Sequence, residues 1–339
     1  YDVENATATF DYYLISYTAF NQNMSNGWSS PTLTTGDVNN DGKQDLIVIG
    51  DNNGERKTIV YINNGTTFTS NAAFKGDIIG FNSGSIGLAD FDRNGWLDLL
   101  IIATNESVSY DVKVYSNNGT RFNLNTSWAA ALERGTGNPN SIALFDYNND
   151  GTTDLLKIGN NGTNTATTRL FKNNGSTFVD DTNIILNKID LSTGATVYGD
   201  FDKDGYMDFV ISGVNSSSTP LTRVFINNRT HFVNSTYWGA ELPDVSDSDL
   251  SVGDLNNDSW LDLIITGRFN SSQNYAQVFL NNGSRFRRNS AFDLYLNQSA
   301  YNSNVIGDYD GDGDLDLIIT GAASGNIISA FKNNGTHFL

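Results

Sequence analysis

The chain has 339 residues, a formal net charge of −18 and no cysteine. Disulfides cannot stabilise it, so any cross-link within the fold has to come from another source, such as bound metal. The longest apolar runs, such as Leu99–Ala103, are too short to cross a bilayer. Twenty of the 38 acidic residues lie at ligand positions of the repeated loops described below, which leaves 18 acids against 20 Lys and Arg. The sequence therefore lacks the basic stripe of a nucleic-acid-binding protein.

Residues 1–30 carry no copy of the repeat that fills the rest of the chain, and we treat them as a separate segment. Within it, Phe10–Phe20 is aromatic and apolar on both alternating faces, which is typical of a strand buried on both sides. One interpretation is a strand that closes a ring or belongs to a degenerate blade. The other is a strand that inserts into a neighbouring molecule. We favour the first.

A nine-residue acidic loop recurs six times within residues 31–339, at intervals of 53 to 56 residues. The first copy reads D-V-N-N-D-G-K-Q-D and runs directly into the apolar stretch L-I-V-I-G. A fixed period of about fifty residues indicates an array of identical supersecondary units. The copies begin at Asp37, Asp90, Asp146, Asp200, Asp254 and Asp308.

Each repeat reads as four short strands, as the third one illustrates. Ser141–Phe145 and Leu155–Ile158 flank the acidic loop, and Arg169–Phe171 and Thr177–Val179 flank an N-N-G turn. Asn-Gly between β-rich stretches is a strong hairpin signal, because both central positions of a type I′ turn need positive φ. Four strands per unit in a repeated array predict an all-β propeller with six regular blades, and six or seven in total.

The loops have the composition of calcium sites. Ca²⁺ takes six to eight oxygen ligands, and here side chains at loop positions 1, 3, 5 and 9 and the carbonyl at position 7 are the candidates. Position 6 turns sharply and is glycine in five loops; the fifth loop has Ser259, so we expect that site to be strained or weaker. Asn94 replaces aspartate at position 5 of the second loop and still offers an amide oxygen.

The sequence thus predicts about six structural Ca²⁺ ions. Their predicted ligands are Asp37, Asn39, Asp41, Lys43 and Asp45 in loop one; Asp90, Asp92, Asn94, Trp96 and Asp98 in loop two; Asp146, Asn148, Asp150, Thr152 and Asp154 in loop three; Asp200, Asp202, Asp204, Tyr206 and Asp208 in loop four; Asp254, Asn256, Asp258, Trp260 and Asp262 in loop five; and Asp308, Asp310, Asp312, Asp314 and Asp316 in loop six.

The pattern D-x-[DN]-x-[DN]-G-x-x-D-[LF], followed by an apolar strand and N-N-G-[TS]-x-F, resembles the FG-GAP/VCBS repeats of integrin-α-type β-propellers. The resemblance covers about residues 31–339. It implies that each loop joins the first two strands of a blade and holds structural Ca²⁺, in propellers that usually have seven blades. The "FG" and "GAP" segments of the integrin version are missing here, and all repeats keep the loop. Related propellers occur in fungal lectins and as modules appended to enzymes.

The motif N-x-[ST] occurs sixteen times, and six copies share one place in the repeat, on the N-N-G hairpin. Turn chemistry alone would produce that register. We favour N-glycosylation at exposed hairpin tips, because Arg229 replaces the glycine of one copy while Thr230 stays. Asn257 lies inside calcium loop five and is expected to stay bare. The predicted glycosylation sites are Asn5, Asn23, Asn64, Asn105, Asn118, Asn125, Asn161, Asn174, Asn215, Asn228, Asn234, Asn270, Asn282, Asn297 and Asn334.

No catalytic constellation is visible, and we expect the chain not to be an enzyme. Its two histidines, His231 and His337, occupy the same variable strand position of the repeat. The clustered aspartates could suggest the carboxylate pair of a glycosidase, but nearly all of them already have a predicted metal-ligand role. Aromatic residues that recur about six positions after an in-register Phe have two interpretations, blade-to-blade packing or sugar-stacking platforms between blades: Phe74, Trp128, Trp238 and Phe292.

These features predict an extracellular, calcium-stabilised, N-glycosylated propeller that acts without catalysis in adhesion or structural assembly, in a surface appendage or matrix. Protein partners or self-assembly are expected, and nucleic acid and a membrane span are not. Millimolar extracellular calcium suits loops of moderate affinity. The alternatives are a carbohydrate-binding lectin with sites between blades, and an accessory propeller module of a larger protein.

Overall fold

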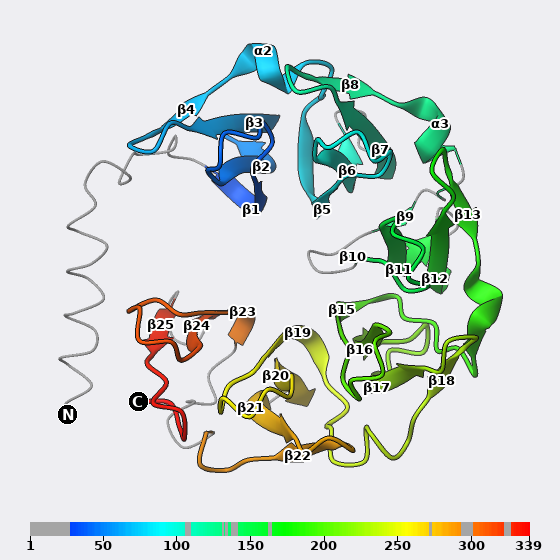
Figure 1. Cartoon of the computed structure of the whole chain (residues 1–339), viewed down its shortest axis with the longest axis vertical. Coiled ribbons are helices and arrows are strands. Elements are labelled where there is room, and N and C mark those ends of the chain that lie inside the picture. Colours follow the sequence, from blue (N-terminus) through cyan, green and yellow to red (C-terminus); the bar gives the residue numbers. More distant parts are fainter. Residues whose placement is uncertain are drawn as a thin grey trace. The chain divides into compact units, whose positions relative to one another are not determined.

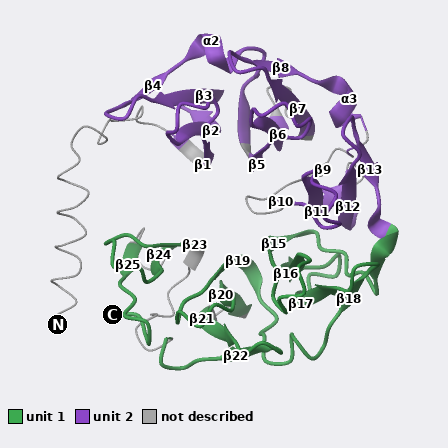
Figure 2. Ribbon diagram, in the orientation of Figure 1, with its two compact units in different colours: residues 1–13, 183–339 green, residues 14–182 purple. Residues whose placement is uncertain are grey.

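The computed structural model describes residues 28–105, 110–130, 132, 135–136, 142–161, 165–270, 273–292, 301–321 and 327–339. Within these residues the regular structure is almost entirely β (Figure 1). The chain divides into two compact units, unit 1 with residues 1–13 and 183–339 and unit 2 with residues 14–182 (Figure 2). The strand predicted at Phe10–Phe20 lies outside the described residues.

Unit 2 contains three blades, each built on four strands in antiparallel order. Blade one consists of β1 (Trp28–Gly36), β2 (Asp45–Asn52), β3 (Glu55–Asn63) and β4 (Phe68–Ser70). Blade two consists of β5 (Phe81–Ala89), β6 (Asp98–Asn105), β7 (Tyr110–Asn117) and β8 (Phe122–Leu124). Blade three consists of β10 (Ile142–Phe145), β11 (Asp154–Asn161), β12 (Ala166–Asn173) and β13 (Phe178–Asp180), with β9 (Gly135–Thr136) paired to the far end of β11.

Unit 1 repeats the arrangement. Blade four consists of β15 (Thr193–Gly199), β16 (Asp208–Val214), β17 (Pro220–Asn227) and β18 (Phe232–Asn234), and β14 (Ile185–Leu186) pairs with β18 in parallel. Blade five consists of β19 (Ser246–Gly253), β20 (Asp262–Asn270), β21 (Gln273–Asn281) and β22 (Phe286–Arg288). Blade six consists of β23 (Tyr301–Gly307), β24 (Asp316–Gly321) and β25 (Ile327–Phe331), and an isolated bridge between Asn333 and Phe338 stands in place of a fourth strand.

Short helical turns follow three of the outer strands: α2 (Ala72–Lys75), α3 (Thr126–Ala129) and the 3₁₀ helix η1 (Thr182–Ile184). Asn71 and Asn125 cap α2 and α3, because each side-chain oxygen accepts the backbone N–H three residues on. None of the helices in the described part of the chain has the length and hydropathy needed to span a membrane.

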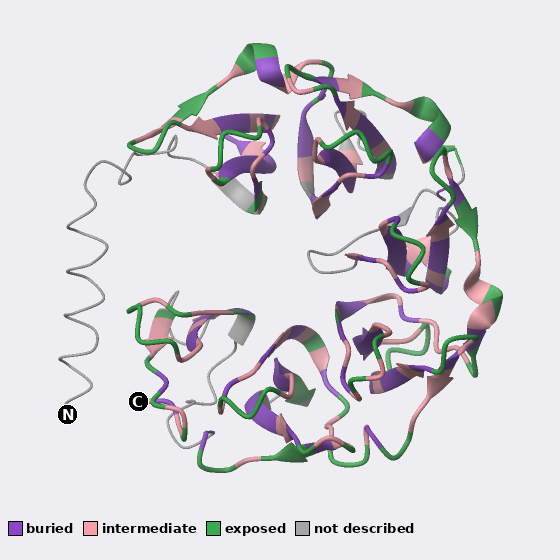
Figure 3. Cartoon of the chain, viewed as in Figure 1, coloured by how far each residue is buried: buried purple, intermediate pink, exposed green. Residues whose placement is uncertain are grey.

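The described residues therefore confirm the predicted all-β propeller fold, with six blades and an acidic loop between the first two strands of each. The second strand of blades one to five is buried on both faces, whereas one face of β24 in blade six is only half-buried at Ile318 (Figure 3). In β2, for example, Ile47 and Ile49 pack toward blade two, while Leu46 and Val48 lie on the opposite face. This explains why these strands read as continuous apolar runs rather than as an alternating pattern.

Aromatic side chains join consecutive blades within each unit. Trp238, which follows the outer strand of blade four, packs edge-on against Phe286 of blade five at 5.6 Å between ring centroids. The same contact joins Phe74 to Phe122, Trp128 to Phe178 and Phe292 to Phe338, at 5.6, 5.2 and 5.3 Å. All four residues that were candidate sugar platforms are buried. Their interpretation as blade-to-blade packing is confirmed, and sugar stacking on these rings is not supported.

In three blades, the outer strand forms hydrogen bonds to the segment of chain that arrives from the preceding blade. The backbone N–H of Asp77 donates to the carbonyl of Phe122 in β8, and the Asp77 carboxylate accepts the N–H of Leu124. In blade five, Glu241 accepts the N–H of Arg288 in β22. In blade four, β14 occupies the edge of β18. The outer strands of these blades therefore have partners for part of their exposed backbone.

We predict that Trp238→Ala lowers the free energy of unfolding by about 3–5 kcal/mol, because it empties a buried aromatic contact between blades. Tyr237→Ala is the matched control: that neighbouring side chain is 57% exposed, and its loss should change stability by less than about 1 kcal/mol. Urea unfolding followed by tryptophan fluorescence and circular dichroism measures both. Equal effects of the two substitutions would contradict the packing role.

Candidate metal centres

Loop four shows how backbone N–H groups arrange the acidic side chains. The two carboxylate oxygens of Asp200 accept the N–H groups of Asp204 and Gly205, at 3.0 and 2.9 Å. Asp202 accepts the N–H of Asp204 at 3.2 Å. These bonds wind residues 200–206 into a tight turn and fix both oxygens of Asp200 and one oxygen of Asp202. Each carboxylate oxygen has further lone pairs that could bind a cation.

The same bonds recur in all six loops. The position 1 aspartate accepts the N–H of position 6 at 2.7 Å for Gly42, 2.8 Å for Gly95, 2.7 Å for Gly151, 2.9 Å for Gly205, 2.7 Å for Ser259 and 3.0 Å for Gly313. The position 3 oxygen accepts the N–H of position 5 whether the residue is aspartate or asparagine. Asparagine at position 3 in loops one, three and five therefore presents its amide oxygen as aspartate does elsewhere.

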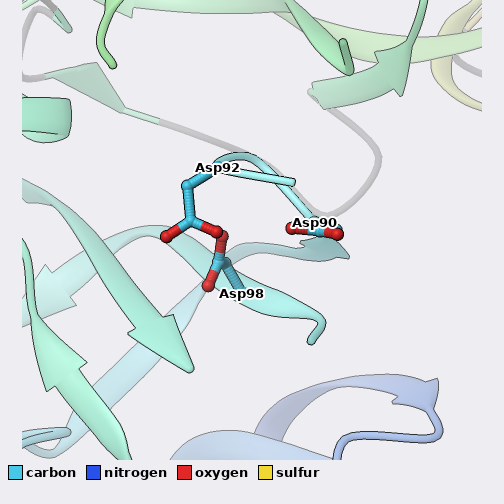
Figure 4. Close-up of side chains that lie close together, drawn as sticks. All are labelled: Asp90, Asp92 and Asp98. Atoms are coloured by element: carbon cyan, nitrogen blue, oxygen red, sulfur yellow. The ribbon is translucent and has the colours of Figure 1, made fainter. Parts of the chain in front are cut away.

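Three loops bring carboxylate oxygens from three aspartates within 4.8 Å of one another. Figure 4 shows this group in loop two, where the carboxylates of Asp90, Asp92 and Asp98 gather at one side of the loop. The other two groups are Asp200, Asp202 and Asp208 in loop four, and Asp308, Asp310 and Asp316 in loop six. An all-oxygen set of this kind fits a hard divalent cation and does not suit a soft metal that prefers sulfur.

The side chains at position 7 lie against the hairpin of their own blade. A Cβ on Gly119 would lie 2.5 Å from the Trp96 ring, and one on Gly283 would lie 2.7 Å from the Trp260 ring. Both rings therefore cover a hairpin glycine. The prediction that position 7 contributes its carbonyl rather than its side chain remains a prediction.

Ser259 holds the backbone conformation that glycine holds in the other loops. Its φ is +70°, while the glycine at position 6 of loop four has a φ of +88°. A residue with a Cβ in this region carries a steric cost that glycine does not. The predicted strain in loop five thus has a structural basis.

The position 9 aspartate is the buried acidic residue of each loop and starts the second strand. In loop four, Asp208 accepts the N–H of Phe201 at 2.9 Å and the N–H of Asn227 at 2.7 Å. Burial raises the pKa of Asp98, Asp154, Asp208 and Asp262 to about 7, although the two backbone bonds to each act in the opposite direction. Burial likewise raises the pKa of Asp45 and Asp316. A cation beside these carboxylates would stabilise the charged form that burial disfavours.

The first asparagine of each N-N-G hairpin is a residue whose role the sequence did not reveal. Its backbone N–H donates to the position 9 aspartate of its own loop, as Asn117 does to Asp98 at 2.7 Å. Its side-chain oxygen accepts the N–H two residues on, as Asn117 does from Gly119. The identical placement of this asparagine in every repeat was the available signal, but turn chemistry and glycosylation were the only roles that the motif indicated.

The six hairpin sequons are exposed and follow turn geometry. In each, the asparagine oxygen accepts a hydroxyl hydrogen bond from the Ser or Thr two residues on, at 2.8 or 2.9 Å. This geometry accounts for the shared register without a glycan, while exposure leaves the sites accessible. Asn125, Asn161, Asn215 and Asn234 are half-buried. Asn105 ends β6 and Asn270 ends β20, whereas Asn5, Asn23 and Asn297 lie outside the described residues.

Comparison with known proteins gives a family and a set of similar folds. A family model described as an FG-GAP-like repeat matches residues 37–101, 200–265 and 254–319, together more than half of the chain. No curated protein sequence matches the chain.

Solved structures similar to the chain include glycoside hydrolases. One is CoXyl43, a β-xylosidase/α-arabinofuranosidase from a compost microbial metagenome, at 10% identity, a TM-score of 0.41 and coverage of 95% of this chain and 96% of that one. Another is the α-L-arabinofuranosidase CtGH43 of Clostridium thermocellum, at 11% identity, a TM-score of 0.34 and 96% coverage of both chains. A third is the allergen Mala s 1 of Malassezia sympodialis, at 9% identity, a TM-score of 0.39 and 94% coverage of both chains.

Glycoside hydrolases are among these similar structures, so the prediction of a non-catalytic protein of adhesion or structural assembly is withdrawn. That function is not carried further. Similarity of this degree assigns no reaction to the chain either, so the expectation that it is not an enzyme stays a prediction.

We predict that Ser259→Gly raises the free energy of unfolding by up to about 1 kcal/mol, because glycine adopts positive φ without a Cβ penalty. Gly205→Ser makes the reverse change in loop four, where a Cβ would meet no atom within 4 Å, and should destabilise by a similar amount. Chemical unfolding of unglycosylated protein measures both. If both substitutions changed the free energy of unfolding in the same direction, backbone conformation would not explain the preference for glycine at position 6.

We predict that the cation-free protein loses stability as pH rises from about 5 to 8. The folded pKa of Asp98, Asp154, Asp208 and Asp262 is about 7, above the ordinary 3.8, so the folded state holds more protons than the unfolded state between these values. This contribution is complete at low pH and disappears as pH passes 7. Urea unfolding of metal-depleted protein at several pH values measures how the free energy of unfolding depends on pH. Asp208→Asn should make this dependence less steep. A free energy of unfolding that rises between pH 5 and 8 would contradict the raised pKa of these aspartates.

Proposed function

Because the chain belongs to the family of proteins built from FG-GAP-like repeats, we propose that it is a calcium-binding β-propeller whose six loops each hold one structural Ca²⁺ ion. The observation that carries the proposal is the grouping of three carboxylates within 4.8 Å in loops two, four and six, with the same backbone bonds in the other three. Ca²⁺ is the divalent cation best suited to a flexible, all-oxygen set of this size.

Each loop would combine oxygens at positions 1, 3, 5 and 9 with the carbonyl at position 7. The bound ion would supply positive charge beside the buried position 9 carboxylate, while the chain itself holds that carboxylate by two backbone N–H groups. Since the ion would bind the native loop and not the unfolded chain, it would stabilise the fold by mass action. The function assigned is cation binding, and no reaction is assigned.

The proposed setting is extracellular. Free calcium there is in the millimolar range, which suits loops of moderate affinity, and the chain has no cysteine whose oxidation would matter. N-glycans on the six exposed hairpin asparagines form part of this proposal. The half-buried sequons, such as Asn125, whose side chain caps α3, are less suited to carry one.

Native mass spectrometry tests the proposal. We predict that the metal-depleted chain takes up six Ca²⁺ ions and that Asp200→Ala takes up five. Asp190→Ala, which removes an acid outside the loops, should still take up six. Calcium should also raise the melting temperature, since a single site filled at 100 times its Kd adds about 2.7 kcal/mol to stability. Uptake of no ions, or an unchanged count in Asp200→Ala, would refute the proposal.

A further inference from the structure

We infer that neighbouring loops bind their cations cooperatively, because the hairpin asparagine of one blade connects the ligand aspartates of two successive loops. The inference rests on the proposed cation binding and adds a coupling between sites. It identifies Asn117, Asn173, Asn281 and Asn333 as positioning residues that touch no cation themselves.

The connection is seen most simply between loops four and five. The Asn281 side-chain amide donates to the carbonyl of Phe201 in loop four at 2.8 Å. The backbone N–H of Asn281 donates to Asp262, the position 9 aspartate of loop five, at 2.8 Å. On the other side, the N–H of Phe201 donates to Asp208, the position 9 aspartate of loop four. Phe201, through its N–H and its carbonyl, and Asn281 thus link Asp208 to Asp262.

The same relay continues from loop five to loop six. The N–H of Leu255 donates to Asp262 at 3.0 Å, and its carbonyl accepts the Asn333 amide at 2.7 Å. The N–H of Asn333 donates to Asp316 at 2.8 Å. Three ligand aspartates in unit 1 are therefore connected in series by hydrogen bonds.

Unit 2 contains the equivalent series. Asn117 donates its amide to the carbonyl of Val38 at 2.8 Å, and Asn173 donates to the carbonyl of Phe91 at 2.8 Å. The N–H groups of Val38 and Phe91 donate to Asp45 and Asp98. All four linking asparagines are essentially fully buried, so water does not compete for these bonds and their geometry is fixed by packing.

A second set of contacts joins the loops at the surface, from position 4 of one loop to positions 6 and 7 of the next. Asn40 donates to the carbonyl of Gly95 at 2.8 Å, and the guanidinium of Arg93 donates to the carbonyl of Gly151 at 3.0 Å. In unit 1, the Lys203 ammonium lies 4.0 Å from the centroid of the Trp260 ring, and Asn257 donates to Asp314.

The coupling follows from the shared residue Phe201, whose N–H and carbonyl bond to opposite sides of the relay. A cation in loop five orders Asp262, which fixes the Asn281 backbone, and the Asn281 amide in turn holds the Phe201 peptide in the conformation that loop four needs. Loop four is then already partly ordered when its own ion binds, so binding there requires less conformational free energy. By reciprocity, an ion in loop four favours binding in loop five by the same factor.

The experiment compares Asn281→Ala with Asn282→Ala by native mass spectrometry at sub-saturating Ca²⁺. The control residue lies in the same hairpin, is exposed, and accepts hydrogen bonds only from within its own blade. In the unchanged chain and in Asn282→Ala, partly loaded species should be rarer than independent binding allows. In Asn281→Ala they should become more abundant, and half-loading of the weakened sites should need at least about fivefold more calcium.

A second measurement does not depend on the folding of Asn281→Ala. Asp254→Ala removes a ligand of loop five that lies outside the relay, and hydrogen exchange in the presence of Ca²⁺ then reports on loop four. Amides of residues 201–208 should exchange at least about fivefold faster than in the unchanged chain, and those of the blade-two loop should not change. Unchanged exchange in loop four overturns the inference.

The two hypotheses fail differently. If the unchanged chain binds no calcium, the proposed function is wrong, and the coupling falls with it. If it binds six ions whose distribution is that of independent sites, calcium binding stands and the coupling is refuted.

Discussion

Each blade is organised around one buried carboxylate, the aspartate at position 9 of its loop. In blade four this is Asp208, which is fully buried and accepts one backbone N–H from its own loop and another from the hairpin that joins the third and fourth strands. A charge removed from water needs such partners, because isolated burial is very costly. The same residue begins the second strand, closes the acidic loop and holds the hairpin. Loop, strand and hairpin therefore cannot be altered independently.

Two of the kinds of contact between blades have different effects. Apolar faces and edge-on aromatic pairs such as Trp238 with Phe286 remove a large area from water, and this attraction has little directional preference. The buried asparagine adds a directional bond, since its amide reaches a single carbonyl in the preceding loop. Apolar burial thus stabilises the stack of blades in each unit, while the asparagine sets how consecutive blades align.

The sequence was sufficient where the determining contacts are local. The predicted ligands of each loop lie within nine residues of one another, and each N-N-G turn spans four. Periodicity and turn chemistry therefore predicted the loops, the hairpins and the blade fold. The asparagine bonds between blades join residues 78 to 82 positions apart, as between Asn333 and Leu255 or Asn173 and Phe91, and no local pattern indicates them. The aromatic positions had two interpretations until burial decided between them. The prediction of adhesion rested on family analogy rather than on a described site, and it is the part that was wrong.

The outer strands are short, three residues in β4, β8, β13, β18 and β22, and three of the blades bond part of that edge to an incoming segment. An array of antiparallel sheets would otherwise present a row of unpaired N–H and C=O groups at every blade, each a template for a strand from another molecule. An outer strand of three residues has too few free backbone N–H and C=O groups to pair stably with a strand of another molecule. A chain this rich in β-structure thereby gains protection against edge-to-edge aggregation from strand length and edge bonding.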